Sequence, residues 1–413
     1  MLGTRLIRFL FRPADRRKLL ISIGAGINQI PLIRGAKNAG YSVISVDQSS
    51  SAPGLLFSDL KIQESVHNHD EIYNKIQELL VDGTIVGALT RSYGEAVRTA
   101  AILNERLHVP FIPVSRIEDL LDKKRMKTVF HKAGIPSPSH RMFDPLKDAK
   151  DYPFILKPAK GHAKHGVRLI KGGADLDAYV AEFPQDGSKS LIKEEYIGGD
   201  EIIAAGIVAD GVYHLVEITD KLTTSHPFFV DIRHQAPSKY FSRWDEIEQL
   251  GQQVTDAFEM KTSPLFLEIR FDGDGNPFII EAVPEFGGEF LADVLIPAHT
   301  GYPFIENCVR AISRCGFVPP QKRKSRCAVI VQYITGTNGT LISHEPVPPA
   351  HKNGMIFCRM FKEIGASVKK PENNHDRIGV IAAKGSSIDE AIIAASAIQD
   401  ALQIVIKPSR KSK

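Results

Sequence analysis

The segments Pro264-Leu-Phe-Leu-Glu-Ile-Arg-Phe271 and Phe278-Ile-Ile-Glu-Ala-Val283 alternate in character, and they flank the sequence Asp272-Gly-Asp-Gly-Asn276. Asp-Gly between alternating hydrophobic runs is a strong hairpin signal, because a type I′ turn requires positive φ at both central residues. The stretch therefore predicts two antiparallel strands joined by a tight turn.

The predicted turn fixes which residues face each other across this hairpin. With Asp274-Gly275 as a two-residue turn, Phe271 faces Phe278 and Glu268 faces Glu281. The Cβ atoms of such opposing residues lie about 5 Å apart on one face of a sheet. Two carboxylates at that distance repel each other, and a hard cation such as Mg²⁺ removes the repulsion and takes their oxygens as ligands. The alternative is a solvated outer face, on which like charges cost little.

Length and composition indicate how many folding units the chain has and which classes of protein are excluded. The chain has 413 residues, of which 43% are hydrophobic and 24% charged, and its formal net charge is +4. It is too long for one ordinary core, so about two to four folding units are expected. The small net charge does not indicate nucleic-acid binding, and no apolar run approaches the length of a membrane span. Four cysteines without C-x-x-C spacing indicate free thiols in a reducing cytosol, so we expect a cytoplasmic protein.

The amino-terminal part predicts a basic leader followed by a parallel-sheet domain. Residues 1–17 carry five arginines among Leu, Ile and Phe, and an amphipathic targeting or membrane-surface helix is the alternative to a plain leader. Apolar strands then alternate with helical patterns, which is typical of a parallel sheet with ligands at the carboxyl ends of its strands. Gly24-x-Gly26 lacks the third glycine of a dinucleotide fingerprint. Thr90 and Arg91 follow the strand that ends at Leu89, and we expect them to hold an anionic substrate unless they form an ordinary polar loop.

The next unit begins with a helix that is predicted to start at Ser115. The sequence Gly134-Ile-Pro-Ser-Pro138 is predicted to end this helix. A strand then ends at Lys157, and the loop from Gly161 to Gly166 follows it. Backbone N–H groups and basic side chains of such a loop can surround an anion, although the P-loop pattern is absent. A basic hairpin tip is the alternative.

The order in which these motifs follow one another along the chain is similar to that of a known family. After the glycine-rich loop come Glu194, Glu195 and Glu201, then the acidic hairpin, and then Pro284-Glu-Phe-Gly-Gly288. From about residue 18 to residue 405 the chain resembles the ATP-grasp superfamily, in the branch of biotin carboxylase, carbamoyl-phosphate synthetase, D-alanine–D-alanine ligase and the amino-acid ligases. Each motif is weak by itself, but the ordered set is specific.

The resemblance implies a site for ATP and Mg²⁺, with Mn²⁺ able to substitute for Mg²⁺. Lys221 resembles a lysine that reaches the phosphates, and Glu268 and Glu281 resemble the magnesium-binding acids. The residues that match the nucleotide-binding motifs are Lys123, Lys157, Gly161, His162, Gly166, Glu194, Glu195, Ile197 and Glu201.

The chain departs from the usual last motif of the family, E-x-N-P-R-x-G-G. Val283 replaces the asparagine, and an apolar side chain cannot coordinate Mg²⁺. Glu285 replaces the arginine, and it is predicted to become a third carboxylate ligand of the metal. Arg270 or Arg233 is then expected to supply the positive charge during catalysis. Arg233 and His234 also lie where relatives place contacts to the acceptor substrate.

The resemblance implies a carboxylate–amine ligase that activates a carboxylate as an acyl phosphate, joins it to an amine and releases ADP and phosphate. Mg²⁺ and lysines would stabilise the transferring phosphoryl group. The alternatives are carboxyphosphate chemistry on bicarbonate, as in a carboxylase or a carbamoyl-phosphate synthetase, and a degenerate ATP-binding protein without catalysis. We expect small-molecule substrates, no nucleic acid, no stable membrane insertion, and a homodimer as a candidate assembly.

The predicted fold class is α/β and α+β multidomain, with a parallel-sheet domain, a two-subdomain ATP-grasp fold and a small carboxyl-terminal α+β domain. The predicted units are a basic leader at 1–17, a pre-ATP-grasp domain at 18–114, a small subdomain with its linker helix at 115–193, a large subdomain at 194–320, a carboxyl-terminal domain at 327–406 and a basic tail at 407–413.

Overall fold

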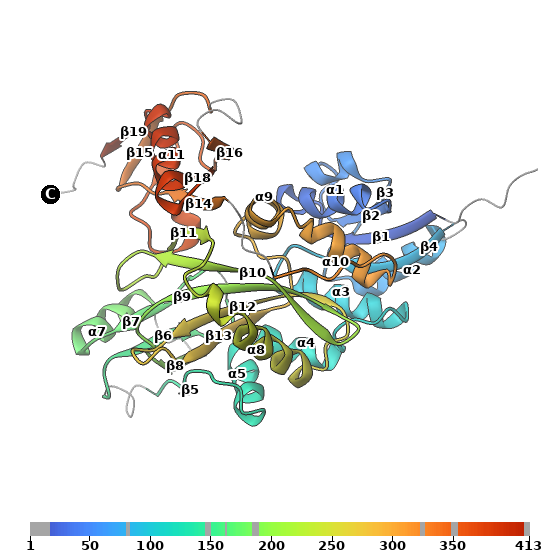
Figure 1. Ribbon diagram of the computed structural model, residues 1–413, viewed down its shortest axis with the longest axis horizontal. Coiled ribbons are helices and arrows are strands. Elements are labelled where there is room, and N and C mark those ends of the chain that lie inside the picture. Colours follow the sequence, from blue (N-terminus) through green and yellow to red (C-terminus); the bar gives the residue numbers. More distant parts are fainter. Residues whose placement is uncertain are drawn as a thin grey trace, which may run out of the picture.

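The computed structural model describes residues 17–79, 83–144, 150–161, 163–183, 190–322, 327–347 and 354–408. The molecule combines an N-terminal parallel sheet, a large antiparallel sheet and a C-terminal region, which confirms the predicted fold class (Figure 1). Residues 1–16 of the predicted leader and His162 of the glycine-rich loop lie outside the described residues.

Four parallel strands form the N-terminal sheet, in the order β3-β2-β1-β4. Its elements are β1 (Arg17–Ile23), α1 (Ile30–Asn38), β2 (Ser42–Asp47), β3 (Leu60–Gln63), α2 (His69–Leu79), β4 (Gly83–Leu89) and α3 (Glu95–Arg106). Gly24 has a φ of +93° directly after β1, where a residue without Cβ lets the chain turn. Because parallel strands end at one edge, the loops after β1 and β4 meet, and Arg91 Nη1 donates to the carbonyl of Asn28 at 3.0 Å.

The helix predicted from Ser115 is two helices instead of one. α4 (Val114–Leu121) begins one residue before Ser115 and has no side-chain cap, so Ser115 does not cap it. α5 (Lys123–Lys132) begins after Asp122, whose Oδ1 accepts from the N–H groups of Lys124 and Arg125 at 3.0 and 3.1 Å. This cap satisfies two orphan donors and restarts the helix, which places Lys123 in the first turn of α5.

A second sheet of four strands carries the glycine-rich loop, in the order β5-β8-β6-β7. Its elements are β5 (His140–Met142), β6 (Phe154–Pro158), β7 (Arg168–Ile170), α7 (Gly173–Glu182) and β8 (Leu191–Glu195). The loop joins β6 to β7, so Lys157 lies at the end of β6, as predicted. The predicted boundary between residues 193 and 194 falls inside β8.

The large sheet has eight strands in the order β13-β12-β9-β10-β11-β14-β18-β16. The strands are β9 (Glu201–Ala209), β10 (Val212–Thr223), β11 (Asp231–Ala236), β12 (Ser263–Phe271), β13 (Pro277–Val283), β14 (Ala328–Ile334), β16 (Met355–Met360) and β18 (Gly379–Gly385). Helices α8 (Trp244–Ala257), α9 (Ile296–Thr300) and α10 (Phe304–Ile312) lie in the same part of the chain. Because β11 pairs with β14, the sheet runs without a break from the predicted large subdomain into the C-terminal region.

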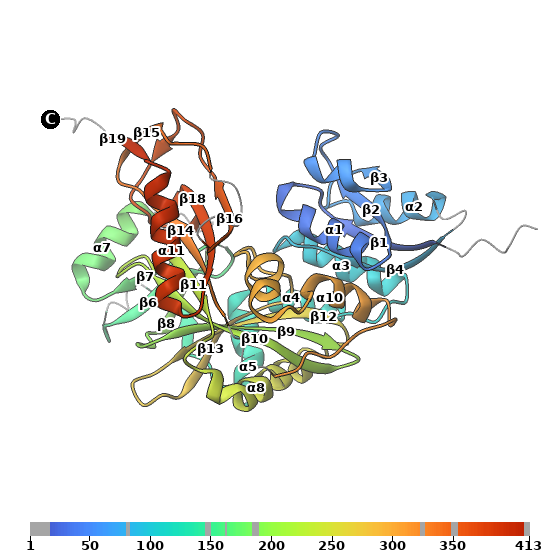
Figure 2. The ribbon, with the colours of Figure 1, turned by 45° about the horizontal axis from the view of Figure 1, so that its top comes forward.

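The C-terminal region adds α11 (Ile388–Ala401) and a small sheet of β17 (Ser367–Val368), β15 (Gly339–Ser343) and β19 (Val405–Pro408). β19 pairs with β15, so Lys407 and Pro408 belong to a sheet and not to the tail that was predicted to begin at residue 407. In Figures 1 and 2, α11 with the small sheet and the N-terminal sheet stand above the part of the large sheet that is formed by β9, β10, β12 and β13.

The acidic hairpin has the predicted partners but a different turn. Phe271 pairs with Pro277 and not with Phe278, and a bulge after Glu268 restores the pairing of Glu268 with Glu281. The connection is a longer loop in which the N–H of Gly275 donates to the carbonyl of Asp272 and Gly275 alone takes a positive φ, +82°. A turn followed by one left-handed residue is the common alternative to the type I′ turn.

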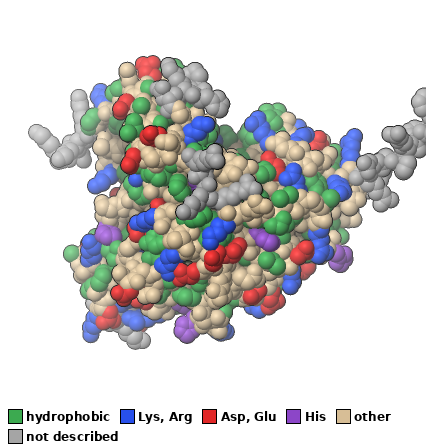
Figure 3. Space-filling view, viewed as in Figure 1, with side chains coloured by type: hydrophobic (Ala, Val, Ile, Leu, Met, Phe, Trp, Pro, Cys, Tyr) green, Lys and Arg blue, Asp and Glu red, His purple; other side chains and the backbone are tan. Residues whose placement is uncertain are grey.

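Two further features concern the surface and the cysteines. Within the described residues, no helix is long and apolar enough to cross a membrane. The four cysteines are free thiols, as predicted. Figure 3 shows basic and acidic side chains intermixed on the face seen in Figure 1.

Candidate active site

A cavity of about 1110 Å³ lies where the four parts of the molecule meet. The predicted site residues that line it are Arg91, Lys123, Lys157, Gly161, Glu194, Glu195, Ile197, Glu201, Glu268, Arg270, Glu281 and Glu285. The C-terminal region adds Asn374, His375 and Arg377, which the sequence did not single out. Thr90, Gly166, Lys221, Arg233 and His234 are not among the described lining residues.

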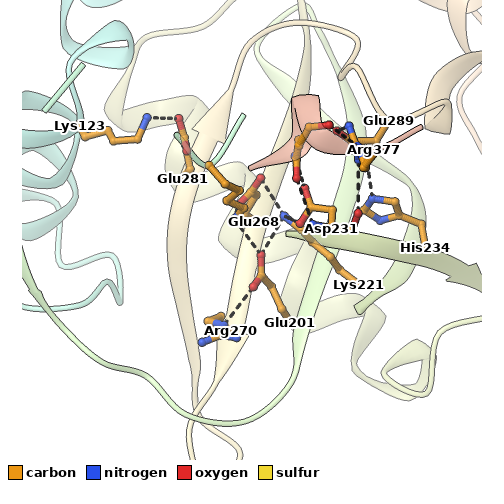
Figure 4. A network of polar contacts seen from close by, with 12 residues as sticks. Lys123, Glu201, Lys221, Asp231, His234, Glu268, Arg270, Glu281, Glu289 and Arg377 are labelled. Carbon is orange, nitrogen blue, oxygen red and sulfur yellow. Dashed lines mark hydrogen bonds and ion pairs between the residues drawn. The ribbon is translucent and has the colours of Figure 1, made fainter. Parts of the chain in front are cut away.

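A cluster of three acids and three cations occupies the floor of the cavity (Figure 4). Lys221 Nζ lies 2.9 Å from Glu201, 3.1 Å from Glu268 and 3.3 Å from Asp231. Burial disfavours the charged lysine, but the three carboxylates outweigh it and hold the pKa of Lys221 well above its ordinary value. Lys221 is therefore a buried cation that holds the acids in place, and it does not reach the cavity directly.

Arg270 also supports this cluster. Its Nε lies 3.1 Å from Glu201, and its Nη1 donates to the carbonyl of Ile197 at 2.9 Å. The guanidinium further lies 5.2 Å from the ring centre of Phe229. With its donors engaged in this way, Arg270 orients Glu201 and the segment after β8.

Lys164 of the glycine-rich loop reaches the same acids from the opposite wall. Its Nζ lies 3.2 Å from Glu268 and 3.5 Å from Glu201. Ala163 and Lys164 have φ values of 56° and 62°, and this left-handed pair turns the lysine inward. The sequence pointed to basic residues in this loop, but only the structure shows that Lys164 joins the carboxylate pair.

A second buried cluster lies under the loop. Lys157 Nζ is 2.8 Å from Glu194 Oε1, and Lys127 Nζ is 3.6 Å from the same oxygen. Burial lowers the pKa of Lys127 to about 8, with Lys157 adding to the effect and Glu194 opposing it. Lys127 lies on α5 at a position that is typical of an ordinary helix residue, so no motif marks it.

Lys123 links the small sheet to the hairpin. Its Nζ donates to Glu281 Oε1 and to the carbonyl of Gly161, both at 2.9 Å. Thus Glu281 and Glu268 face each other across the hairpin, and each carboxylate is neutralised by lysine.

The predicted third metal ligand lies apart from this pair. Within the described part of the chain, no group of three or more His, Cys, Asp or Glu side chains is arranged to hold a metal ion. Glu285 Oε2 accepts from the N–H of Gly287 at 2.8 Å, because the chain turns back after β13. Glu268 and Glu281 pair across the hairpin, and among the described residues Glu285 does not join them in a group of three acids arranged around one metal ion.

Several other predicted residues have structural partners instead of facing the cavity. Thr90 Oγ1 donates to the carbonyl of Ile23 at 2.8 Å, which ties β4 to β1. The carbonyl of Gly166 accepts from Tyr179 Oη at 2.8 Å. Arg233 pairs with Leu222, so it points to the face opposite Lys221, which pairs with the next residue, His234.

His234 lies behind the cavity wall and contacts Glu289, with Nε2 3.8 Å from Oε2. Arg377 of the C-terminal region binds the same carboxylate at 2.6 and 3.2 Å and stacks on Tyr333 at 3.7 Å. Arg91 binds Asp293 at 2.5 Å, although it was predicted to hold a substrate anion.

Family comparisons agree with this architecture. Residues 150–293 match the ATP-grasp domain, and residues 332–407 match the L-amino acid ligase C-terminal domain 2. The alanine–anticapsin ligase of Bacillus subtilis (strain 168) is 25% identical over 288 residues, which are 60% of this chain and 60% of that protein. The chain thus spans about three fifths of the length of this curated relative.

Solved structures share the fold. The L-amino acid ligase from Bacillus licheniformis superposes with a TM-score of 0.76 at 19% identity, over 95% of this chain and 100% of that chain. The biotin carboxylase domain of the Hydrogenobacter thermophilus 2-oxoglutarate carboxylase, in complex with ADP, magnesium and bicarbonate, gives 0.71 at 17% identity, over 95% and 91%. The protein therefore contains an ATP-grasp domain followed by an L-amino acid ligase C-terminal domain, and it has the ATP-grasp fold.

Proposed function

We propose that this protein is an ATP-dependent carboxylate–amine ligase that forms ADP. It would activate a small carboxylate as an acyl phosphate and join it to an amine, with release of phosphate. The observation that carries the proposal is the shared cavity, in which lysines of the small sheet face a carboxylate pair of the large sheet. The ATP-grasp match and the ligase relative support the same reading.

The nucleotide site of the proposal lies between the two ATP-grasp sheets. Lys157 at the end of β6 and Lys123 at the start of α5 are buried cations that line the cavity. Both would neutralise phosphate oxygens, and the lysines are already held by Glu194 and Glu281 at 2.8 and 2.9 Å. The loop around Gly161 would cover the phosphates and exclude water, which would hydrolyse an acyl phosphate.

The residues present fit a divalent metal. The side chains of Glu268 and Glu281 retain 20% and 18% exposure toward the cavity, whereas Glu201 is held at 5%. Two partly exposed carboxylates on one face suit Mg²⁺, which prefers oxygen ligands and keeps several waters. When bound there, Mg²⁺ would neutralise the charge of the transferring phosphoryl group.

The buried cations would keep Glu268 and the neighbouring Glu201 in position during the reaction. Lys221 anchors Glu268 from below, and Arg270 fixes Glu201, so neither acid has to reorganise when substrate binds. This assigns Lys221 and Arg270 the role of positioning residues. We also propose a location in the cytoplasm and a homodimer as the assembly.

The test is an assay of ADP and phosphate release from Mg·ATP with pairs of carboxylates and amines, including the common amino acids and bicarbonate. The proposal expects release that requires both partners, and an amide product detected by mass spectrometry. Release that requires bicarbonate alone would favour carboxyphosphate chemistry. ATP binding without any carboxylate-dependent release would overturn the ligase assignment in favour of a non-catalytic ATP-binding protein.

A further inference from the structure

Glu285 differs from the other buried acids of the cavity wall. The buried carboxylates among the described lining residues are Glu194, Glu201, Asp231 and Glu285. Glu194 pairs with Lys157, while Glu201 and Asp231 pair with Lys221. Glu285 alone has no lysine, arginine or histidine within ion-pair distance among the described residues. A buried carboxylate without a partner costs free energy. A cation from outside the protein that binds at Glu285 would remove this cost.

The neighbours of Glu285 cannot supply that cation. The basic side chain that lowers the pKa of Glu285, Arg91, is bound to Asp293 at 2.5 Å and to the carbonyl of Asn28 at 3.0 Å. The nearby Glu289 is likewise held by Arg377. Burial raises the pKa of the Glu285 carboxyl to about 7, and Arg91 opposes that shift only in part.

The hydrogen bonding of Glu285 leaves it open toward the cavity. Oε2 accepts from the N–H of Gly287 at 2.8 Å, which fixes the carboxyl in one orientation. No described residue binds Oε1, and the side chain belongs to the cavity wall. Glu285 is therefore oriented by its own loop and has one free acceptor oxygen for a ligand.

Glu285 shares a neighbour in the cavity wall, Tyr93, with the hairpin acid Glu281. The phenol of Tyr93 is affected by both Glu281 and Glu285, which raise its pKa together with burial as the largest cause. Tyr93 also lines the cavity and lies 5.9 Å from Lys123, the partner of Glu281. Glu285 and Glu281 therefore both act on the phenol of Tyr93 and line the same cavity.

From this geometry we propose that Glu285 is the receptor for the ammonium group of an amine-bearing substrate. The proposal rests on the ligase function above and refines it, because it assigns a specific side chain to the amine. A buried carboxyl group that lines the cavity and has no basic partner makes this position suited to a cation. The carboxylate and the fixed Oε1 supply a charge-assisted hydrogen bond to the ammonium N–H.

The proposal excludes two other occupants. A free carboxylate ligand would be repelled by Glu285, which points the reacting carboxylate of the substrate toward the lysines instead. A metal ion would need further ligands, and Glu289, the other acid that affects the pKa of Glu285, is held by Arg377.

The test compares amine-bearing probes with their des-amino analogues on the same protein. Binding of each common amino acid, and of its des-amino acid, is measured by saturation-transfer NMR and calorimetry in the presence of Mg²⁺ and a non-hydrolysable ATP analogue. The wild-type protein should bind at least one amine-bearing probe, and its des-amino analogue at least about tenfold more weakly. This arm needs no variant. Equal binding of the two, or preference for the des-amino acid, would overturn the proposal.

The second arm uses Glu285→Gln, which keeps the shape and removes the charge. We expect at least about tenfold weaker binding of the amine-bearing probe, with unchanged affinity for the ATP analogue. Glu363→Gln is the matched control, because Glu363 is an exposed acid of the same cavity wall, and it should change neither affinity. Amine affinity that survives in Glu285→Gln would refute the receptor role.

The outcome is separable from that of the proposed function. If no substrate pair gives phosphate release but amine binding still depends on Glu285, the ligase assignment fails and the ammonium site stands. If phosphate release is found and its KM for the amine is the same in wild type and Glu285→Gln, the ligase assignment stands and the ammonium site fails.

Discussion

Asp231 on β11 and Asn374 in the C-terminal region, 143 residues apart, bond to each other twice. The N–H of Asp231 donates to Asn374 Oδ1 at 3.1 Å, and Asn374 Nδ2 donates to Asp231 Oδ2 at 2.7 Å. The other carboxylate oxygen of Asp231 lies 3.3 Å from Lys221. The N–H of Asn374 donates to the carbonyl of Ala163 at 3.0 Å. One asparagine therefore joins the C-terminal region, the acidic floor and the glycine-rich loop.

Replacement of Asn374 by alanine should destabilise the protein by about 1–3 kcal/mol, because it leaves a buried carboxylate oxygen and a buried N–H of Asp231 without partners. Urea unfolding measures the change. Asn38→Ala is the control, since Asn38 makes a long, exposed bond of 3.4 Å to Glu306 and should cost less than about 0.5 kcal/mol. Equal stability of the two variants would contradict the joining role of Asn374.

Lys157→Ala should weaken ATP binding by at least about tenfold, because it removes a buried cation from the proposed phosphate site. Isothermal calorimetry with Mg·ATP gives the affinity. The control is Lys160→Ala, which removes an exposed lysine three residues further along the chain and outside the main cavity, and this variant should bind ATP like the wild type. Unchanged affinity in Lys157→Ala would place the nucleotide elsewhere.

Lys164→Ala should strengthen the binding of Mn²⁺ in the absence of nucleotide. The lysine lies 3.2 Å from Glu268 and 3.5 Å from Glu201, so it occupies the place of a cation between the two walls. Removal of Lys164 takes one positive charge away from Glu268 and Glu201, so these carboxylates attract a metal ion more strongly. We expect the affinity for Mn²⁺ to rise about tenfold. Electron paramagnetic resonance of free Mn²⁺ reports the affinity. Lys362→Ala, another lysine of the cavity wall, should show no gain. No gain in Lys164→Ala would mean that the loop lysine does not compete with a metal.

Glu285→Gln should be more stable than the wild type at pH 8 but not at pH 5. Burial raises the carboxyl pKa from 4.5 to about 7. A raised pKa means that the folded protein binds the proton more tightly than the unfolded chain, so stability is lost as the pH rises from 4.5 to 7. The neutral glutamine avoids this loss, which amounts to at most about 3 kcal/mol above pH 7. Urea unfolding at both pH values measures it, and a pH-independent difference would show that Glu285 is not buried as a carboxyl group.

Those parts of the site that depend only on residues close together in the sequence were predicted from local sequence patterns. The strand that ends at Lys157 and the pairing of Glu268 with Glu281 both follow from short segments. The pairing was predicted with the wrong turn, because neither the longer loop nor the bulge after Glu268 leaves a signal in the residue pattern. The two deviations compensate, since the bulge adds one residue to β13.

Contacts between distant segments were not predictable in this way. Asn374 reaches Asp231 only because β11 pairs with β14 and extends the large sheet into the C-terminal region. Lys127 of α5 lies 3.6 Å from Glu194 of β8, and this contact joins segments that are far apart in the chain. Each depends on packing of elements far apart in the chain, which periodicity and turn residues do not encode.

The central claim is that a carboxylate is activated by transfer of a phosphoryl group from ATP. A carboxylate substrate found in the substrate assay is labelled with oxygen-18 in both carboxylate oxygens and turned over with Mg·ATP and its amine partner. An acyl phosphate carries one carboxylate oxygen to the phosphate, so mass spectrometry should find one labelled oxygen in each inorganic phosphate released. Unlabelled phosphate from the same reaction, with the amide product formed, would contradict the account.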